Sequence, residues 1–296
     1  MIVLRSLLFT PGNNMRMISK AGGRGADAVI LDLEDSVPMS DKETARLFVR
    51  DSLEETGRGG SSVFCRVNSL DTGLLDDDLA WVVRKGLAGV MLPKAEGAEG
   101  VAELASRLDA LEKEHGLETG SVAIVPLLES AKGILNASEV ASASPRVAAL
   151  AFGGVDFCRD MGIEPTREQV ELFHPRARIA IAARAAGVAS VDTPCIDARD
   201  RERLAAEART ARGLGFGGKL LIHPSQVAPV NEAFSPSEAD VERARRIASA
   251  FEEARAAGKG AISVDGKMVD EANYRQAADL VRSAEEIAAR GTSERA

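Results

Sequence analysis

Cysteine is scarce in this sequence, and its three cysteines lie far apart, at Cys65, Cys158 and Cys195. No Cys-x-x-Cys pair occurs, and no Cys/His cluster has the spacing of a zinc site. Each cysteine has apolar neighbours, which favours small buried hydrophobic residues over reactive thiols. The cysteines therefore indicate neither a zinc site nor a reactive centre.

Several other features are missing. No apolar run approaches the roughly 20 residues that a membrane span needs. The first residues lead into a strand pattern and not into a signal peptide. The 37 basic residues are outnumbered by 45 acidic ones, which argues against a nucleic-acid-binding surface. No GxGxxG or Walker A motif is present, which weakens the case for a dinucleotide-binding fold. We expect a cytoplasmic protein that binds neither membranes nor nucleic acid.

The rest of the composition is typical of a globular protein with a large core, with 45% apolar and 28% charged residues among 296. Short apolar runs alternate with helical patterns. They cover residues 6–11, 28–35, 63–68, 89–94, 123–129, 147–156, 189–193 and 219–224. Such alternation predicts βαβ units and a parallel sheet covered on both faces. Eight units favour an α/β fold that closes into a (β/α)8 TIM barrel over an open doubly wound sheet.

About 70 residues follow the eighth strand. Ser235 and the residues after it resemble a capped helix start, and a tight Asp265-Gly266 turn precedes the last helix. We expect residues 1–234 to form the catalytic barrel. Residues 235–296 would form a C-terminal helical extension or lid that contacts a neighbouring subunit.

Charged residues stand where several apolar runs end. In a barrel, the C-terminal ends of all strands meet at one mouth, so these residues can share one site. Glu129 and Asp156 are expected at the ends of the adjacent strands five and six. Two carboxylates there would suit an open Mg²⁺ site, since this ion takes oxygen ligands and keeps several waters. A salt-bridged barrel rim is the alternative.

Strands two and three end in further charges. Alternation along the strand places Asp32 and Glu34 on one face, where a nearby cation would relieve their repulsion. Asp35 could instead serve the start of the next helix. Arg66 could hold a substrate carboxylate and stabilise oxyanion charge, and it could also pair with these acids.

The loop after the first strand is a candidate anion-binding site. It consists of Pro11, Gly12 and Asn13, followed by Arg16 and Lys20. Backbone N–H groups at a helix N-terminus attract anions, and the two basic side chains add positive charge.

Three further residues are candidates for ligand contact. Lys94 could form a Schiff base, but no neighbouring sequence ensures the desolvation that would lower its pKa, so a charge or substrate-binding role is favoured. Gly154 permits close approach of the backbone to a ligand. His223 is either a buried, hydrogen-bonded histidine or a ligand contact.

These residues lie in motifs that resemble the citrate lyase β-subunit/malyl-CoA lyase family, which belongs to the HpcH/HpaI aldolase superfamily. The matching motifs are RSLLFTPGN (5–13), AVILDLEDSV (28–37), CRVNSLDT (65–72), VMLPKAE (90–96), PLLESAKGI (126–134), LAFGGVDF (150–157), KLLIHPSQV (219–227) and GKMVD (266–270). The resemblance implies a TIM barrel, commonly a trimer or hexamer, that uses Mg²⁺, or Mn²⁺ in its place. Its reaction cleaves or forms a C–C bond between a 2-oxo acid and a CoA thioester.

The resemblance also implies roles for single residues. Glu129 and Asp156 match the Mg²⁺ ligands, and Arg66 matches the arginine that binds the oxo acid and stabilises the enolate. Asp270 matches an acid/base aspartate that enters a neighbouring subunit's site, and Glu34 joins Arg66 and Asp270 as a candidate catalytic residue. The loop at residues 11–13 falls near the CoA-binding region.

The resemblance favours a lyase that converts malyl-CoA or citramalyl-CoA to glyoxylate or pyruvate and acetyl-CoA. One alternative is a citrate lyase β-subunit that acts on citryl groups carried by a partner protein and releases oxaloacetate. Another is a divalent-metal aldolase acting on free hydroxy-oxo acids. A non-catalytic subunit that binds CoA or a metabolite is an alternative of another class.

Overall fold

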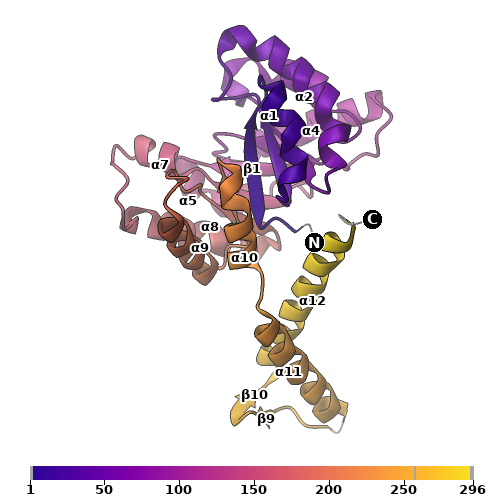
Figure 1. The fold of residues 1–296 in the computed structure, drawn as a ribbon, viewed down its shortest axis with the longest axis vertical. Helices are drawn as coiled ribbons and strands as arrows, with labels where there is room; N and C mark the ends of the chain where they lie inside the picture. Colours follow the sequence, from indigo (N-terminus) through magenta and orange to yellow (C-terminus); the bar gives the residue numbers. More distant parts are fainter. Residues whose placement is uncertain (1–2, 257, 294–296) are drawn as a thin grey trace. The chain divides into compact units, whose positions relative to one another are not determined.

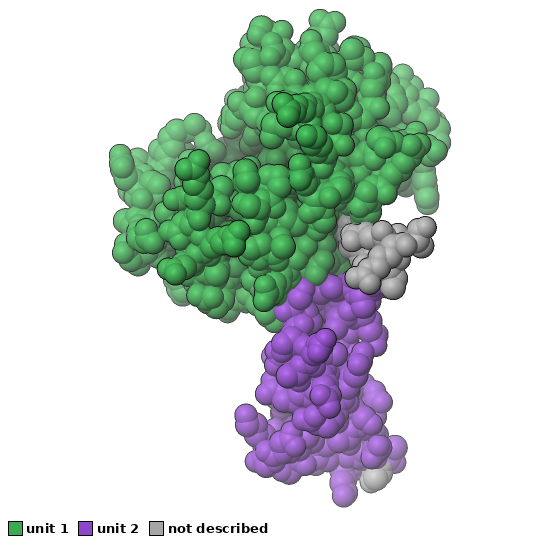
Figure 2. Space-filling view, viewed as in Figure 1, with its two compact units in different colours: residues 1–234 green, residues 235–296 purple. Residues whose placement is uncertain are grey.

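The structure is a computed structural model that describes residues 3–256 and 258–293. It divides into two compact units, residues 1–234 and residues 235–296 (Figure 2). In the described residues, the first unit contains a closed barrel of eight parallel strands in the order β1 to β8. This confirms the TIM-barrel fold expected from the sequence.

Helices connect the strands and lie outside the barrel (Figure 1). The strands are β1 (Ser6–Pro11), β2 (Ala28–Asp32), β3 (Ser62–Arg66), β4 (Gly89–Leu92), β5 (Ala123–Leu128), β6 (Ala149–Phe152), β7 (Ala189–Asp192) and β8 (Gly218–Leu221). The α-helices of this unit are α1 (Met15–Ala21), α2 (Lys42–Gly57), α3 (Leu75–Val82), α4 (Ala98–Glu114), α5 (Ala131–Leu135), α6 (Ala137–Ala141), α7 (Gly154–Asp160), α8 (Phe173–Ala186), α9 (Arg201–Leu214) and α10 (Val227–Phe234).

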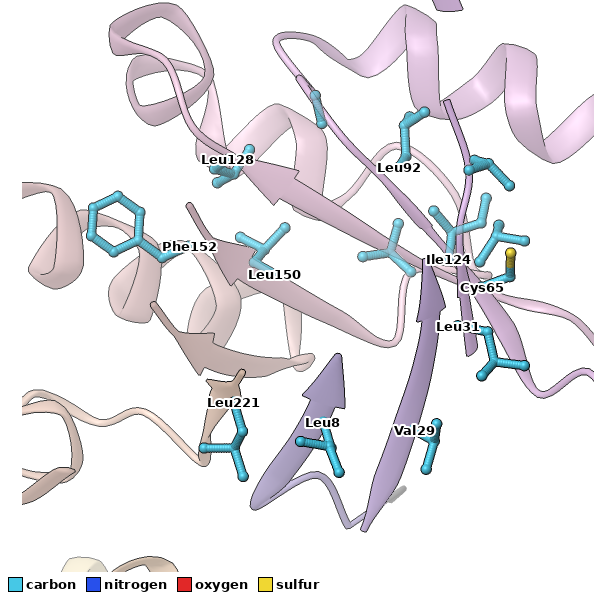
Figure 3. Close-up of a cluster of buried hydrophobic side chains, with 14 of the residues drawn as sticks. Leu8, Val29, Leu31, Cys65, Leu92, Ile124, Leu128, Leu150, Phe152 and Leu221 are labelled. Atoms are coloured by element: carbon cyan, nitrogen blue, oxygen red, sulfur yellow. The ribbon is translucent and has the colours of Figure 1, made fainter. Parts of the chain in front are cut away.

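The strands bury side chains on both faces, which explains their nearly continuous apolar sequences. Leu7 and Ile30 belong to a cluster made of strand residues and their immediate flanks, which fills the barrel. Leu8, Val29 and Leu31 belong to a second cluster that also contains helix residues and therefore lies between the barrel and its helices. Figure 3 shows strand residues of this outer cluster.

Three strands end at least three residues earlier than the sequence suggested. The second ends at Asp32, because its carboxylate accepts hydrogen bonds from the backbone N–H groups of Glu34 and Ser36 and turns the chain. The sixth ends at Phe152, because α7 begins at Gly154. The eighth ends at Leu221, two residues before His223 caps a short helix.

The second unit is a pair of helices with a small hairpin between them. Its elements are α11 (Glu238–Ala256), β9 (Ile262–Val264), β10 (Lys267–Val269) and α12 (Glu271–Ser293). The hairpin turns at Asp265 and Gly266, both with positive φ, as the sequence predicted. The serine that caps α11 is Ser237 and not Ser235, since its Oγ accepts the N–H of Asp240. None of the helices that the structure describes has the length and apolarity of a membrane-spanning segment.

Candidate active site at the barrel mouth

Arg66 is held firmly at the barrel mouth by acidic partners. It ends β3 directly beside Asp32, and its Nε and Nη2 donate to the two carboxylate oxygens of Asp32 at 2.7 Å each. Its Nη1 lies 3.0 Å from Glu34 Oε2, and its guanidinium lies 4.8 Å from the centre of the Phe9 ring. The expected pairing of Arg66 with the acids of strand two is confirmed, and the pairing fixes the guanidinium in one orientation.

The carboxylates beside Arg66 have opposite protonation tendencies. Burial alone would raise the pKa of Asp32, but its hydrogen bonds with Arg66 and the charge of Arg66 lower that pKa below its usual value. Burial raises the pKa of Glu34, and the charges of Arg66 and Lys94 only partly offset this. Neither carboxylate oxygen of Glu34 accepts a well-aligned hydrogen bond from the described residues. Glu34 therefore has hydrogen-bonding capacity left for a ligand.

Lys42 holds the chain segment that carries these acids, a role that the sequence analysis missed. Its buried ammonium contacts the backbone carbonyls of Leu33 and Glu34 and the side-chain oxygen of Asn68. Asn68 in turn donates to Asp78 on α3. A lysine eight residues after Glu34 carries no signal of this role, because its partners are backbone carbonyls and a residue 26 positions away.

Glu129 lies immediately after β5 and is nearly completely buried. Its Oε1 accepts the backbone N–H of Lys94 at 2.7 Å. Any side chain at Gly153 would clash with it, since a Cβ there would lie 2.7 Å from Glu129 Oε2. The pKa of Glu129 is raised to about 8, mainly by burial; the charges of Asp156 and Glu34 also raise it, while the hydrogen bond from the Lys94 N–H and the charge of Arg66 lower it. These carboxylates therefore lie close enough to repel one another.

Asp156 does not end a strand, contrary to the expectation. It lies in the first turn of α7, because β6 ends four residues earlier. Its side chain is 27% exposed and pairs with Arg159 at 2.8 Å. Since Phe152 pairs with Leu128, the turn before α7 still brings Asp156 near Glu129.

The arrangement fits a magnesium ion. A cation would stabilise the buried carboxylate of Glu129, near which Asp156 and Glu34 add negative charge, and the glycine at position 153 leaves space for this carboxylate. No group of three or more His, Cys, Asp or Glu side chains in the described chain forms a preformed metal cage. Mg²⁺ is often bound by one or two carboxylates, with water and substrate completing the shell. Glu129 and Asp156 could therefore hold the ion together with the substrate.

A cavity of about 400 Å³ lies between β1, α1 and the segment after β8. Arg16, Lys20 and His223 all line it, together with Phe9 and Arg24. Arg24 was missed by the sequence analysis, although its spacing of four residues from Lys20 repeats the spacing between Arg16 and Lys20. The ring of Phe9 also contacts the guanidinium of Arg66.

His223 is exposed, so it is not the buried histidine that was one of the two expectations. Its Nδ1 accepts the backbone N–H of Ser225 and contacts the Ser225 hydroxyl, which leaves Nε2 as the atom that could meet a ligand.

In the loop at residues 11–13, the backbone N–H of Gly12 is not available to an anion. The N–H of Gly12 donates to Asp32 O, and the N–H of Asn14 donates to Pro11 O. The side chain of Asn13 donates to Asp41. Gly12 is required for close packing, since a Cβ there would lie 2.5 Å from Asp32 O. The loop is thus tied to β2, and Arg16 and Lys20 remain as its charged candidates.

The remaining candidates lie elsewhere. The N–H of Gly154 donates to Thr193 Oγ1, so this amide packs α7 against the end of β7. Asp270 lies in the second unit and caps α12, where its carboxylate accepts the N–H groups of Ala272 and Asn273. Its expected role in another subunit's site stays a prediction.

Comparison with known proteins gives one consistent result. The family model "HpcH/HpaI aldolase/citrate lyase" matches residues 5–224. The chain is 38% identical to the citrate lyase subunit beta of Leuconostoc mesenteroides subsp. cremoris over 90% of this chain and 88% of that protein. It is 36% identical to the L-malyl-CoA/beta-methylmalyl-CoA lyase of Cereibacter sphaeroides over 96% of each.

A similar solved structure is protein CitE from Mycobacterium tuberculosis in complex with magnesium, acetoacetate and coenzyme A. Its TM-score is 0.75 at 32% sequence identity, and the match covers 95% of this chain and 98% of that one.

Proposed function

The chain belongs to the HpcH/HpaI aldolase/citrate lyase family, and we propose that it is a Mg²⁺-dependent lyase that cleaves or forms CoA thioesters of 2-hydroxy dicarboxylic acids, of the malyl-CoA or citramalyl-CoA type, whose hydroxyl group lies β to the thioester carbonyl. It is a carbon–carbon lyase whose products are a 2-oxo acid, glyoxylate or pyruvate, and acetyl-CoA. The observation that supports this most is the grouping of Glu129, Asp156, Glu34 and Arg66 at one barrel mouth.

In this proposal Glu129 and Asp156 hold Mg²⁺ and Arg66 acts on the thioester. The bound ion supplies Lewis-acid polarisation of the substrate oxygens. Glu34 accepts the proton of the 2-hydroxyl group, as its buried, incompletely hydrogen-bonded carboxylate suggests. The C2–C3 bond then breaks, its electrons pass to the thioester carbonyl, and Arg66 stabilises the resulting enolate oxygen.

Proton transfer to the enolate carbon completes the cleavage. We assign this step to Asp270 of a neighbouring copy of the chain, which would make the enzyme a homo-oligomer such as a trimer or hexamer. Asp270 is only partly buried at the N-terminus of α12, so its carboxylate could act on a substrate. In the condensation direction the same group would remove the proton.

The phosphates of the CoA moiety would bind in the cavity beside α1. Arg16, Lys20 and Arg24 supply positive charge there, and His223 also lines the cavity. Because Phe9 is shared between this cavity and Arg66, a ligand in the cavity could extend its thioester to the guanidinium.

The second candidate is a citrate lyase β-subunit, which is favoured by the 38% identity with such a subunit. The purified full-length chain should be assayed alone with malyl-CoA, citramalyl-CoA and citryl-CoA, each with Mg²⁺ and with excess EDTA. Mg²⁺-dependent release of glyoxylate or pyruvate would support the proposal. Release of oxaloacetate from citryl-CoA, with no activity on the other two thioesters, would favour the second candidate. Inactivity on all three thioesters, also after a carrier partner is added to the assay, would favour a non-catalytic binding subunit.

A further inference from the structure

Lys94 adopts a backbone conformation that its residue type disfavours. Its φ is +52°, in the left-handed region that glycine, asparagine and aspartate occupy far more readily. The other positive-φ residues that are not glycine in the described chain are Gln169 and Asp265. Such strained residues persist only where the surrounding structure fixes them, and they cluster at functional sites.

The sheet on both sides fixes this conformation. Leu92 is the last residue of β4 and pairs with Pro126 of β5. The next hydrogen bond between these two segments is donated by the N–H of Ala95 to Leu127 O at 3.1 Å. In regular parallel pairing the N–H of Lys94 would donate to Leu127 O, so the segment of Pro93 and Lys94 contains one extra residue and forms a bulge. Bulges of this kind redirect groups beside active sites.

The bulge directs both polar ends of Lys94 toward carboxylates of the mouth. Its backbone N–H donates to Glu129 Oε1 at 2.7 Å. Its ammonium, 46% exposed, lies 3.5 Å from Glu34 Oε1. A different φ at this position would turn the Lys94 N–H relative to the following chain, which the bond from Ala95 N to Leu127 O holds in place.

We propose that Lys94 is a positioning residue whose left-handed backbone aims its amide at Glu129 and whose ammonium orders Glu34, so that one residue sets both carboxylates for the reaction. This inference rests on the proposed function, in which Glu129 is a magnesium ligand. It develops the charge role, one of the two roles favoured for Lys94 from the sequence.

The backbone role is tested by a pair of variants that both remove the ammonium. Lys94→Gly allows positive φ, whereas Lys94→Val strongly disfavours it. Titration of metal-free, full-length protein with MgCl₂ by calorimetry measures the Kd for Mg²⁺ without an activity assay. We expect Lys94→Gly to bind Mg²⁺ within about threefold of the wild type and Lys94→Val to bind it at least about tenfold more weakly. Equal affinities of the two variants would overturn the backbone role.

The ammonium is tested by kinetics. Lys94→Met should lower kcat for the CoA ester about tenfold with little change in KM, and Lys94→Arg should restore most of that loss. Wild-type kcat in Lys94→Met would overturn this part of the inference.

Two controls separate the possible failures. A wild-type protein that binds no Mg²⁺ would refute the proposed function itself, whereas tight binding by the wild type and equally by both variants refutes only the role of Lys94. Thermal unfolding checks that each variant is folded. If Lys94→Val does not fold, Lys94→Asn and Lys94→Ala replace the pair, since asparagine tolerates positive φ better than alanine.

Discussion

Replacing Asp32 by asparagine tests whether the orientation of Arg66 matters for catalysis. Both carboxylate oxygens of Asp32 accept from Arg66 at 2.7 Å, and they also accept the N–H groups of Glu34 and Ser36. An amide turns one acceptor into a donor that faces the guanidinium. Removing one partner of a buried ion pair typically costs about 3–5 kcal/mol. Because Arg66 keeps its contact with Glu34, we expect the lower end, about 3 kcal/mol.

That loss corresponds to a decrease of about 6–12 °C in Tm for a unit of this size. The released guanidinium would no longer meet the enolate oxygen, so kcat should fall about 100-fold. Thermal unfolding and steady-state cleavage of the CoA ester measure the two effects on the same preparation.

Asp27 provides a matched control. Asp27 lies directly before β2, whereas Asp32 is the last residue of that strand, and the two side chains are equally buried. Both carboxylate oxygens of Asp27 also accept hydrogen bonds from an arginine, Arg5, at 2.8 Å. Because it lies at the opposite end of the strand, Asp27→Asn should lower Tm similarly while kcat stays within about twofold. If Asp32→Asn loses stability like the control but keeps wild-type kcat, the catalytic role of Arg66 in this position is refuted.

Three further predictions concern charge. Changing Arg16 and Lys20 together to glutamine should raise KM for the CoA ester about tenfold with kcat nearly unchanged, and an unchanged KM would remove the basic cavity from CoA binding. Asp270→Asn should lower kcat at least about 100-fold without weakening binding of the CoA ester, whereas full activity would exclude Asp270 from proton transfer. Glu112 is buried, which would raise its pKa, but Arg146 holds that pKa at about 2, below the ordinary 4.5. Its contribution to stability is therefore present above about pH 4.5 and is lost as pH falls toward 2. Urea unfolding of Glu112→Gln should show a loss of about 2 kcal/mol at pH 7 that shrinks by pH 3, and a pH-independent difference would contradict this.

The strands were predictable because their signal is local. Runs such as Ala28–Asp32 are apolar at every position but the last, since both barrel faces are covered, and a charge marks the mouth. The grouping of Arg66 with Asp32 and Glu34 followed from barrel closure alone.

The errors at the site arose from hydrogen bonds that depend on tertiary structure. The sequence predicts that Gly12 helps to bind an anion, but its backbone N–H donates to Asp32 O on the neighbouring strand. The sequence predicts that Asp156 ends a strand, but α7 begins at the two glycines before it. The left-handed backbone of Lys94 follows from the β4–β5 pairing, which a single sequence does not display.

Binding of Mg²⁺ by the pair of Glu129 and Asp156 is the claim on which the proposed chemistry depends. Calorimetric titration of the metal-free protein with MgCl₂ tests it directly, with Glu129→Gln as the variant and Glu96→Gln, which alters a carboxylate of the adjacent rim, as the control. We predict one Mg²⁺ per chain for the wild type and the control, and an affinity at least about 100-fold lower for Glu129→Gln. Equal Mg²⁺ affinity of the wild type and Glu129→Gln would contradict the account.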